Sequence, residues 1–155
     1  MNEDVLNTPG HLVSLAARAF ARLSEDRLGP LGFGVGHLPV LVALENRIAT
    51  TQKDLTRFAR IEQPPMAQML ARMERDGLIT RTRDKLDRRS SRIALTQAAR
   101  GRLPRATEAV MQGNRDALAG FSEADKKMLV DLLRRLIGNL DRLATTDGKP
   151  SKNEA

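Results

Sequence analysis

Six consecutive residues, starting at Asp84, carry the side chains whose chemistry is easiest to interpret. They include three cations, Lys85, Arg88 and Arg89, beside two acids, Asp84 and Asp87. Because two carboxylates cannot neutralise three cations, we expect unpaired positive charge to project here. Such charge suits DNA phosphates and the minor groove of narrow A·T tracts, where the negative potential is deepest. We expect Asp87 to pair with a neighbouring arginine and fix the segment's conformation instead of touching DNA. The alternative is a merely solvated turn.

A second group of candidate contacts lies just before this segment, on a helix predicted over residues 63–77. Its prolines suit the first turn of a helix, where backbone N–H groups are free. Apolar residues recur on one face, which leaves the opposite face to Gln63, Pro65, Ala67, Gln68 and Arg72. A glutamine can bind adenine with two hydrogen bonds, and an arginine can bind guanine or a phosphate. The pattern predicts contacts in a major groove; the alternative is an ordinary amphipathic helix whose polar face meets only water.

Hydrophobic periodicity and capping signals predict the elements that position these two groups. Helices are expected over about 10–28, 37–46, 51–59, 63–77, 96–120 and 122–143, with strand-like residues at 78–83 and 91–95. Thr51 with Asp54, and Ser122 with Asp125, have the spacing of capping boxes, and Thr96 is a candidate N-cap. A helix-turn-helix followed by a basic β-hairpin is a winged helix, which places a helix in one DNA groove and cations in the next.

Several finer expectations follow from single residues. The helix after Thr51 should bury Leu55 and Phe58, and Pro104 should kink the fifth helix or split off its first turn. The glycine-rich stretch 31–36 has G-x-G-x-G spacing, but no strand precedes it and no acidic partner follows, so we expect a flexible connector. Residues 1–9 and 144–155 are expected to be flexible tails.

The composition agrees with a polyanionic partner. The net charge is +7 and the sequence pI is about 10.7. Residues 60–92 hold nine Lys and Arg against five Asp and Glu, so four of the seven charges lie there. The absence of Tyr and Trp leaves almost nothing for stacking on single-stranded bases. The absence of cysteine, of a signal peptide and of a membrane span predicts a cytoplasmic protein that does not bind membranes.

Nothing in the chain predicts catalysis, a metal or a cofactor. Its two histidines, His11 and His37, lack carboxylates or thiols at ligand spacing, and two ligands are too few for zinc. G-x-S-x-G, phosphate-loop and H-E-x-x-H patterns are absent. We therefore expect a protein that is not an enzyme.

The terminal helices carry more apolar surface than a small winged helix can cover. The last helix has leucines at a 4-3-4-3 spacing: Leu129, Leu133, Leu136, Leu140 and Leu143. These leucines could pack on their own domain, but dimerisation would bury the surplus. A two-fold dimer would set two recognition helices one DNA turn apart, roughly 34–36 Å.

The pattern resembles the MarR family of bacterial transcription regulators. The resemblance covers residues 10–143 and rests on the element order α-α-α-α-β-β-α-α and on the local sequences of residues 37–44, 51–55 and 73–79. Its most specific part is Asp87-Arg-Arg-Ser-Ser-Arg-Ile-Ala-Leu-Thr96, which is similar to the family's wing signature. It implies a mainly α fold with a small hairpin. A winged helix-turn-helix over 36–96 would bind DNA, and a helical region over 10–30 and 97–143 would dimerise.

The resemblance also implies a function. Members are homodimers that bind pseudo-palindromic DNA, usually as repressors, and many release it when a small organic effector enters a pocket. Here Asp87 would order the wing and Arg89 would enter the minor groove. Major-groove positions would be Gln63, Pro65, Gln68 and Arg72, and the effector pocket would include some of Arg18, Phe33, His37 and Leu41.

The chain also departs from the family pattern. Pro64 and Pro65 stand where relatives often have Ser or Thr, so two hydroxyls that could contact phosphate are missing. The lack of cysteine excludes the peroxide-sensing branch, and the two histidines argue against the zinc-sensing branch. Few aromatic residues are available for a ligand cage. A constitutive or architectural DNA-binding dimer without an effector therefore remains the alternative to an effector-responsive repressor.

Overall fold

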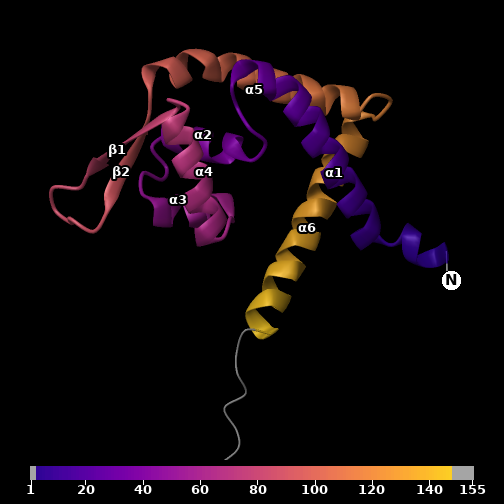
Figure 1. The fold of residues 1–155 in the computed structure, drawn as a ribbon. Helices are drawn as coiled ribbons and strands as arrows, with labels where there is room; N and C mark the ends of the chain where they lie inside the picture. Colours follow the sequence, from indigo (N-terminus) through magenta and orange to yellow (C-terminus); the bar gives the residue numbers. More distant parts are fainter. Residues whose placement is uncertain (1–2, 148–155) are drawn as a thin grey trace, which may run out of the picture. The chain divides into compact units, whose positions relative to one another are not determined.

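The structure, a computed structural model, describes residues 3–147 (Figure 1). Two 3-10 turns, η1 Glu3–Asn7 and η2 Gly29–Leu31, lie before and after the first α-helix. The helices are α1 Pro9–Leu28, α2 His37–Glu45, α3 Gln52–Ala59, α4 Gln63–Arg75, α5 Gln97–Ala117 and α6 Glu123–Asp147, and the strands are β1 Ile79–Arg83 and β2 Ser91–Leu95. The predicted order α-α-α-α-β-β-α-α is confirmed. The chain forms two compact units, 1–114 and 115–155.

The helices begin where their capping residues predict. The hydroxyl of Thr51 accepts the N–H of Asp54 at 3.2 Å, which opens α3. The hydroxyl of Thr96 accepts the N–H of Ala99 at 3.1 Å and donates to the carbonyl of Gly77 at 2.7 Å. Thr96 therefore both opens α5 and fastens it to the end of α4, satisfying a helix N–H that would otherwise lack a partner.

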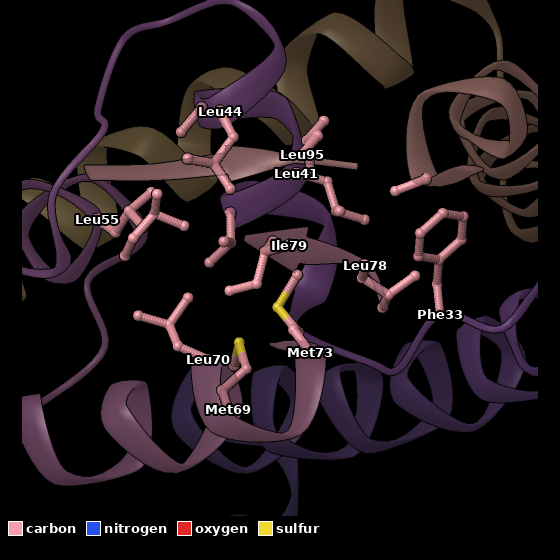
Figure 2. Close-up of a cluster of buried hydrophobic side chains, with 14 of the residues drawn as sticks. Phe33, Leu41, Leu44, Leu55, Met69, Leu70, Met73, Leu78, Ile79 and Leu95 are labelled. Carbon is pink, nitrogen blue, oxygen red and sulfur yellow. The ribbon is translucent and has the colours of Figure 1, made fainter. Parts of the chain in front are cut away.

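A single apolar core joins α2, α3, α4 and the hairpin in the first unit (Figure 2). Alternation along the hairpin turns Ile79, Ile93 and Leu95 inward, and the antiparallel register pairs Ile79 with Leu95. On α4 the buried residues are Met66, Met69, Leu70 and Met73. The N–H of Ile93 donates to the carbonyl of Thr50 at 2.8 Å, so β2 is also tied to the segment before α3. The core therefore fixes α4 and the hairpin relative to each other.

Helices α1 and α5 complete the first unit and lie side by side there (Figure 1). Leu28, Leu103 and Ala106 are buried with the winged-helix core. Gly113 of α5 is close to α1, because a Cβ there would lie 3.5 Å from Leu23 Cδ2. That distance is an ordinary van der Waals contact, so the two helices pack directly against each other at this position.

The second unit is dominated by α6. Ser122 and Asp125 form both bonds of the predicted capping box: the Ser122 N–H donates to the Asp125 carboxylate at 2.9 Å, and the Asp125 N–H donates to the Ser122 hydroxyl at 3.1 Å. Large apolar side chains along α6 are exposed, namely Met128, Leu129, Val130, Leu132, Leu133, Ile137, Leu140 and Leu143. None of the helices within residues 3–147 is long and apolar enough to cross a membrane.

Several expectations about local structure are wrong. Phe58 is 42% exposed, although Leu55 is buried as predicted, because the side chain of Phe58 lies outside the face that α3 turns to the core. Residues 3–7 form a 3-10 turn, and α6 continues through residues 144–147. The remaining tail residues, 1–2 and 148–155, lie outside the described part.

Pro104 does not split α5, which runs as one helix from Gln97 to Ala117. Proline removes one helical hydrogen bond, but Leu103 and Ala106 on either side of it are buried, so packing holds both turns in place. Pro104 itself faces solvent, where water can satisfy the freed carbonyl.

Residues 31–36 are not a free connector. The guanidinium of Arg102 donates to the carbonyl of Leu31 at 3.1 Å and lies 5.6 Å from the centre of the Phe33 ring. Gly32 has a φ of +81°, and a Cβ there would lie 2.5 Å from the Arg102 Nη1 atom. The positive φ favours glycine at this position, and a larger residue would also displace the Arg102 guanidinium that fastens the loop to α5.

Candidate nucleic-acid interface

Helix α4 presents one polar face to solvent. Pro64 and Pro65 occupy its first turn, where no backbone hydrogen bond is lost. Its methionines and leucine fill the core, so Gln63, Pro65, Gln68 and Arg72 are all exposed, as the periodicity predicts. An exposed row of amide and guanidinium groups on a core-anchored helix has the chemistry for reading base edges.

A hydrogen bond joins the starts of the two helices of the helix-turn-helix. The side-chain amide of Gln52 donates to the Gln63 side-chain oxygen at 3.1 Å. Gln52 begins α3, and Gln63 begins α4. The bond limits the rotamers of Gln63 while leaving its own NH₂ group free to donate. Sequence reasoning missed Gln52, because a contact eleven residues away has no periodic signal.

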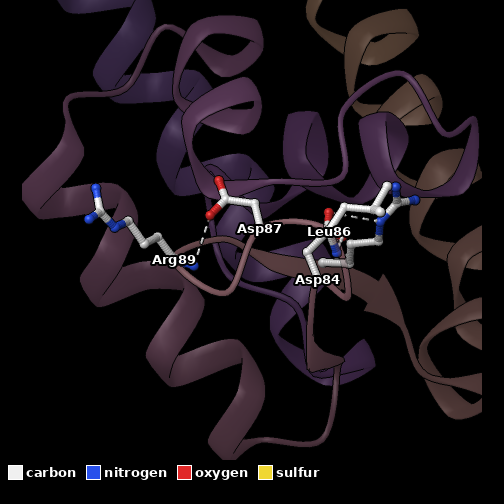
Figure 3. Close-up of polar contacts among 5 residues, drawn as sticks. Asp84, Leu86, Asp87 and Arg89 are labelled. Atoms are coloured by element: carbon white, nitrogen blue, oxygen red, sulfur yellow. Dashed lines mark hydrogen bonds and ion pairs between the residues drawn. The ribbon is translucent and has the colours of Figure 1, made fainter.

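Two aspartates organise the turn between the strands (Figure 3). The Asp87 carboxylate accepts the backbone N–H of Arg89 at 3.0 Å, and the Asp84 carboxylate accepts the backbone N–H of Leu86 at 3.0 Å. Two backbone bonds close the turn: the Asp84 N–H donates to Ser90, and the Ser90 N–H donates to Asp87, each at 3.0 Å. The turn is therefore shaped by its own acids.

The prediction that Asp87 pairs with an arginine side chain is wrong. Asp87 binds the backbone of Arg89, whose guanidinium points away from it (Figure 3). Asp84, which sequence reasoning did not single out for this role, is the acid that pairs with an arginine: the Arg92 Nε lies 3.4 Å from its carboxylate. The Leu86 N–H and then Arg92 lower the pKa of Asp84, so its carboxylate stays charged well below neutral pH.

The cations of the turn are available to a partner. Lys85, Arg88 and Arg89 are exposed. Within residues 3–147, none of these three side chains forms an ion pair with a carboxylate. The unpaired charge expected from the sequence is therefore present at the end of the hairpin.

An ion pair fastens the hairpin to the end of α4. The Arg81 Nε lies 2.7 Å from the Glu74 carboxylate, and the Arg81 side chain is only 29% exposed. Because Arg81 is in β1 and Glu74 in α4, the pair holds the strand against the helix that carries the polar row. Sequence reasoning missed this link as well.

Helices α3 and α4 and the hairpin form an open groove of about 540 Å³. It lies between the starts of α3 and α4 and the hairpin, and is lined by Thr51, Gln52, Lys53, Gln63, Arg81, Asp87, Arg89, Ser90, Ser91 and Ile93. Three cations face one acid there, beside hydroxyl and amide groups that donate hydrogen bonds. The lining suits an extended polyanion better than an apolar small molecule.

Within residues 3–147, no group of three or more His, Cys, Asp or Glu side chains is arranged so that it could hold a metal ion.

The sequence model described as the MarR family matches residues 36–91, from the start of α2 to the start of β2. Over residues 36–91 the chain therefore carries a MarR-family domain. Members are transcriptional regulators and not enzymes, so this chain is a DNA-binding transcriptional regulator. The matched segment contains α4, the hairpin turn and every residue that lines the groove except Ile93.

Individual relatives agree with this assignment. YwoH of Bacillus subtilis, called an uncharacterized HTH-type transcriptional regulator, is 24% identical over 127 residues, which cover 82% of this chain and 92% of YwoH. The transcriptional repressor CouR, solved bound to a 23-mer DNA duplex, is 23% identical with a TM-score of 0.77; the match covers 88% of this chain and 98% of CouR.

A further solved structure is BpsR of Bordetella bronchiseptica, whose DNA binding is regulated by 6-hydroxynicotinic acid. It is 22% identical with a TM-score of 0.73, over 82% of this chain and 96% of BpsR. At these identities the two solved structures establish the winged-helix fold of the family.

The MarR resemblance also predicts an effector pocket, and the structure distributes its four residues among different surroundings. Phe33 and Leu41 are 3% and 0% exposed and fill the core (Figure 2). Arg18 is exposed on α1, ten residues or about 15 Å of helix before Leu28. His37 is half-buried, and its Nδ1 accepts the N–H of Gly34 at 2.9 Å. Two of the four side chains are thus buried, one is half-buried and one is exposed.

Proposed function

We propose that this regulator is a homodimer that represses transcription in the cytoplasm by binding a pseudo-palindromic DNA site, and that a small organic effector releases it. The observation that carries the DNA part is the polar row of α4 beside unpaired cations on the hairpin, with the groove between them. Gln63, Pro65, Gln68 and Arg72 would contact the major groove. Lys85, Arg88 and Arg89 would contact phosphates and the minor groove, with Asp87 shaping the turn.

The exposed apolar face of α6 supports dimerisation. Leu129, Leu133 and Leu140 recur on one side of the helix and are 37%, 36% and 54% exposed. Surface of this kind is unfavourable in water, and a second copy offers the same pattern in return. Together with α1 and α5 it would form the helical dimerisation region proposed over 10–30 and 97–143.

Repression and effector release are supported by relatives. CouR is a transcriptional repressor solved with DNA, and BpsR is regulated by 6-hydroxynicotinic acid. A DNA-binding dimer without an effector is the second candidate, and the burial of Phe33 and Leu41 favours it, because neither side chain offers free surface to a ligand.

Selection of bound duplexes from genomic fragments tests the proposal first. The recovered site should contain two half-sites related by a pseudo-dyad, and the complex should contain two copies of the 17.1-kDa chain. Selection that enriches no sequence would contradict specific binding. Screening small aromatic and organic acids for release of the labelled duplex then separates the two candidates, since the second predicts no release by any compound.

A further inference from the structure

Leu86 stands out on the hairpin turn because nothing covers it. Its exposed fraction is 94%, whereas the next most exposed large apolar side chain among the described residues is Leu143 at 61%. Its immediate neighbours are Lys85 and Asp87, and Arg88 and Arg89 follow. Isolated apolar residues are common on protein surfaces, but this one lies in the turn that joins the two strands and is almost fully exposed.

The turn holds Leu86 in this position. The Leu86 N–H donates to the Asp84 carboxylate at 3.0 Å, and the same carboxylate contacts Arg92 from the second strand (Figure 3). The backbone bonds between Asp84 and Ser90 and between Ser90 and Asp87 close the loop around it. A side chain carried by such a bonded turn can meet a partner without first ordering the backbone, which lowers the entropy cost of binding.

The surrounding charge selects the class of partner. Both aspartates of the turn already accept hydrogen bonds within it, whereas Lys85, Arg88 and Arg89 have no carboxylate partner within residues 3–147. A purely apolar protein surface would leave these cations desolvated and unpaired. A DNA groove offers phosphates for the cations and deoxyribose C–H groups for an apolar side chain at the same time.

We propose that Leu86 is an apolar contact to the minor groove, packing its isobutyl group against sugar walls and the edges of A·T pairs. The inference rests on the proposed function and adds a recognition element to it. The minor-groove edge of a G·C pair carries the guanine amino group, which an apolar side chain would desolvate without replacing its hydrogen bond. Leu86 therefore favours A·T pairs beneath the wing independently of Arg89. Apolar side chains serve minor-groove binders in this way.

The test compares Leu86→Ala with wild type on the labelled duplex recovered by genomic selection. We expect about tenfold weaker binding, from loss of most of a buried leucine side chain. The dependence of affinity on salt should not change, because no phosphate contact is lost. Lys85→Ala should instead lower the salt dependence by about one ion. Ile48→Ala is the matched control, since Ile48 is an exposed apolar residue (58%) elsewhere in the same unit.

A modified duplex locates the contact in the groove. Replacing adenine by 2,6-diaminopurine beneath the wing adds an amino group to the minor-groove edge and leaves the major-groove edge unchanged. Wild type should lose affinity on this duplex, and Leu86→Ala should lose less. Arg89→Ala, which retains Leu86, should keep part of the penalty.

The outcomes separate the two proposals. If wild type binds the selected duplex but Leu86→Ala has wild-type affinity and the full diaminopurine penalty, the leucine contact is refuted while the proposed function stands. If wild type selects no duplex, both are refuted. The thermal unfolding midpoint of Leu86→Ala should equal that of wild type, so that a loss of affinity reports contact and not folding.

Discussion

At the scale of single residues, the proposed function depends on a few side chains that have no carboxylate partner within residues 3–147. The wing turn uses Asp84 and Asp87 to bind its own backbone, which frees Arg89 and its neighbours for a partner. His37 shows the opposite arrangement, since a half-buried ring is used as an acceptor for the Gly34 N–H. Each of these assignments can be tested by one substitution.

Arg89→Ala should weaken binding to A·T-flanked duplexes by about 1–3 kcal/mol, as expected for a specific groove contact. The side chain is exposed and forms no ion pair with a carboxylate within residues 3–147, so the fold should be unaffected. Fluorescence anisotropy of a labelled duplex measures the change, and Arg105→Ala on α5 controls for the loss of one positive charge. Equal affinities of Arg89→Ala and Arg105→Ala would remove Arg89 from the interface.

Protonation of His37 should destabilise the fold as the pH falls below the ordinary histidine value of 6.5. Burial lowers the pKa of His37, the charge of Arg72 lowers it further, and Asp76 opposes both. The unfolded chain therefore takes up the proton first, and stability is lost from about pH 6.5 down to the lowered pKa. The loss cannot exceed about 1.4 kcal/mol per pH unit, the limit for one proton.

Urea unfolding at several pH values from 7.5 to 5 measures this effect. His37→Gln, which keeps a side-chain acceptor but does not titrate, should show a shallower decline than wild type over the same range. Identical declines in the two proteins would mean that His37 does not contribute. Carboxylates titrate in both proteins and cancel in the comparison.

At the scale of elements, the sequence was most informative where the determinants are local. Thr51, Thr96 and Ser122 cap helices as predicted, and the apolar period of α4 identified its buried and exposed faces. Contacts between elements had no such signal. The Gln52–Gln63 bond and the Arg81–Glu74 pair join residues that only the folded chain brings together. Phe58 was misassigned for a related reason, because α3 is too short for its period to define the edge of the buried face.

Thr96→Val should destabilise the first unit by about 1–2 kcal/mol. The substitution keeps the shape but removes the N-cap of α5 and the bond to the Gly77 carbonyl. Chemical denaturation gives the free energy of unfolding. Thr107→Val, at an exposed position within the same helix, is the control and should change stability by much less. Similar losses of unfolding free energy in both variants would show that the N-cap of α5 does not contribute to stability.

At the scale of the whole molecule, the proposed activity requires two copies of the chain. One polar helix and one wing can contact a single half-site, whereas two-fold symmetry doubles the interface and selects a pseudo-palindrome. The exposed leucines of α6 are the surface that we expect to pair, and a charge placed among them would be buried without a partner.

Leu133→Glu should therefore yield a monomer and lower affinity for a two-half-site duplex by at least about tenfold. Sedimentation equilibrium reports the mass and anisotropy reports binding. Arg135→Gln makes the same change of one charge two residues later, which is the opposite side of the helix at 100° per residue, and should remain dimeric. A dimeric Leu133→Glu would place the interface elsewhere.

Hydroxyl-radical footprinting of the selected duplex tests the central claim most directly, since it reports which deoxyriboses along the duplex the bound protein shields. A dimer should give two protected segments one helical turn apart, roughly 34–36 Å, each flanked by minor-groove protection that disappears in Arg89→Ala. A single protected segment, or flanking protection that survives this substitution, would contradict binding by a dimer whose wings enter the minor groove.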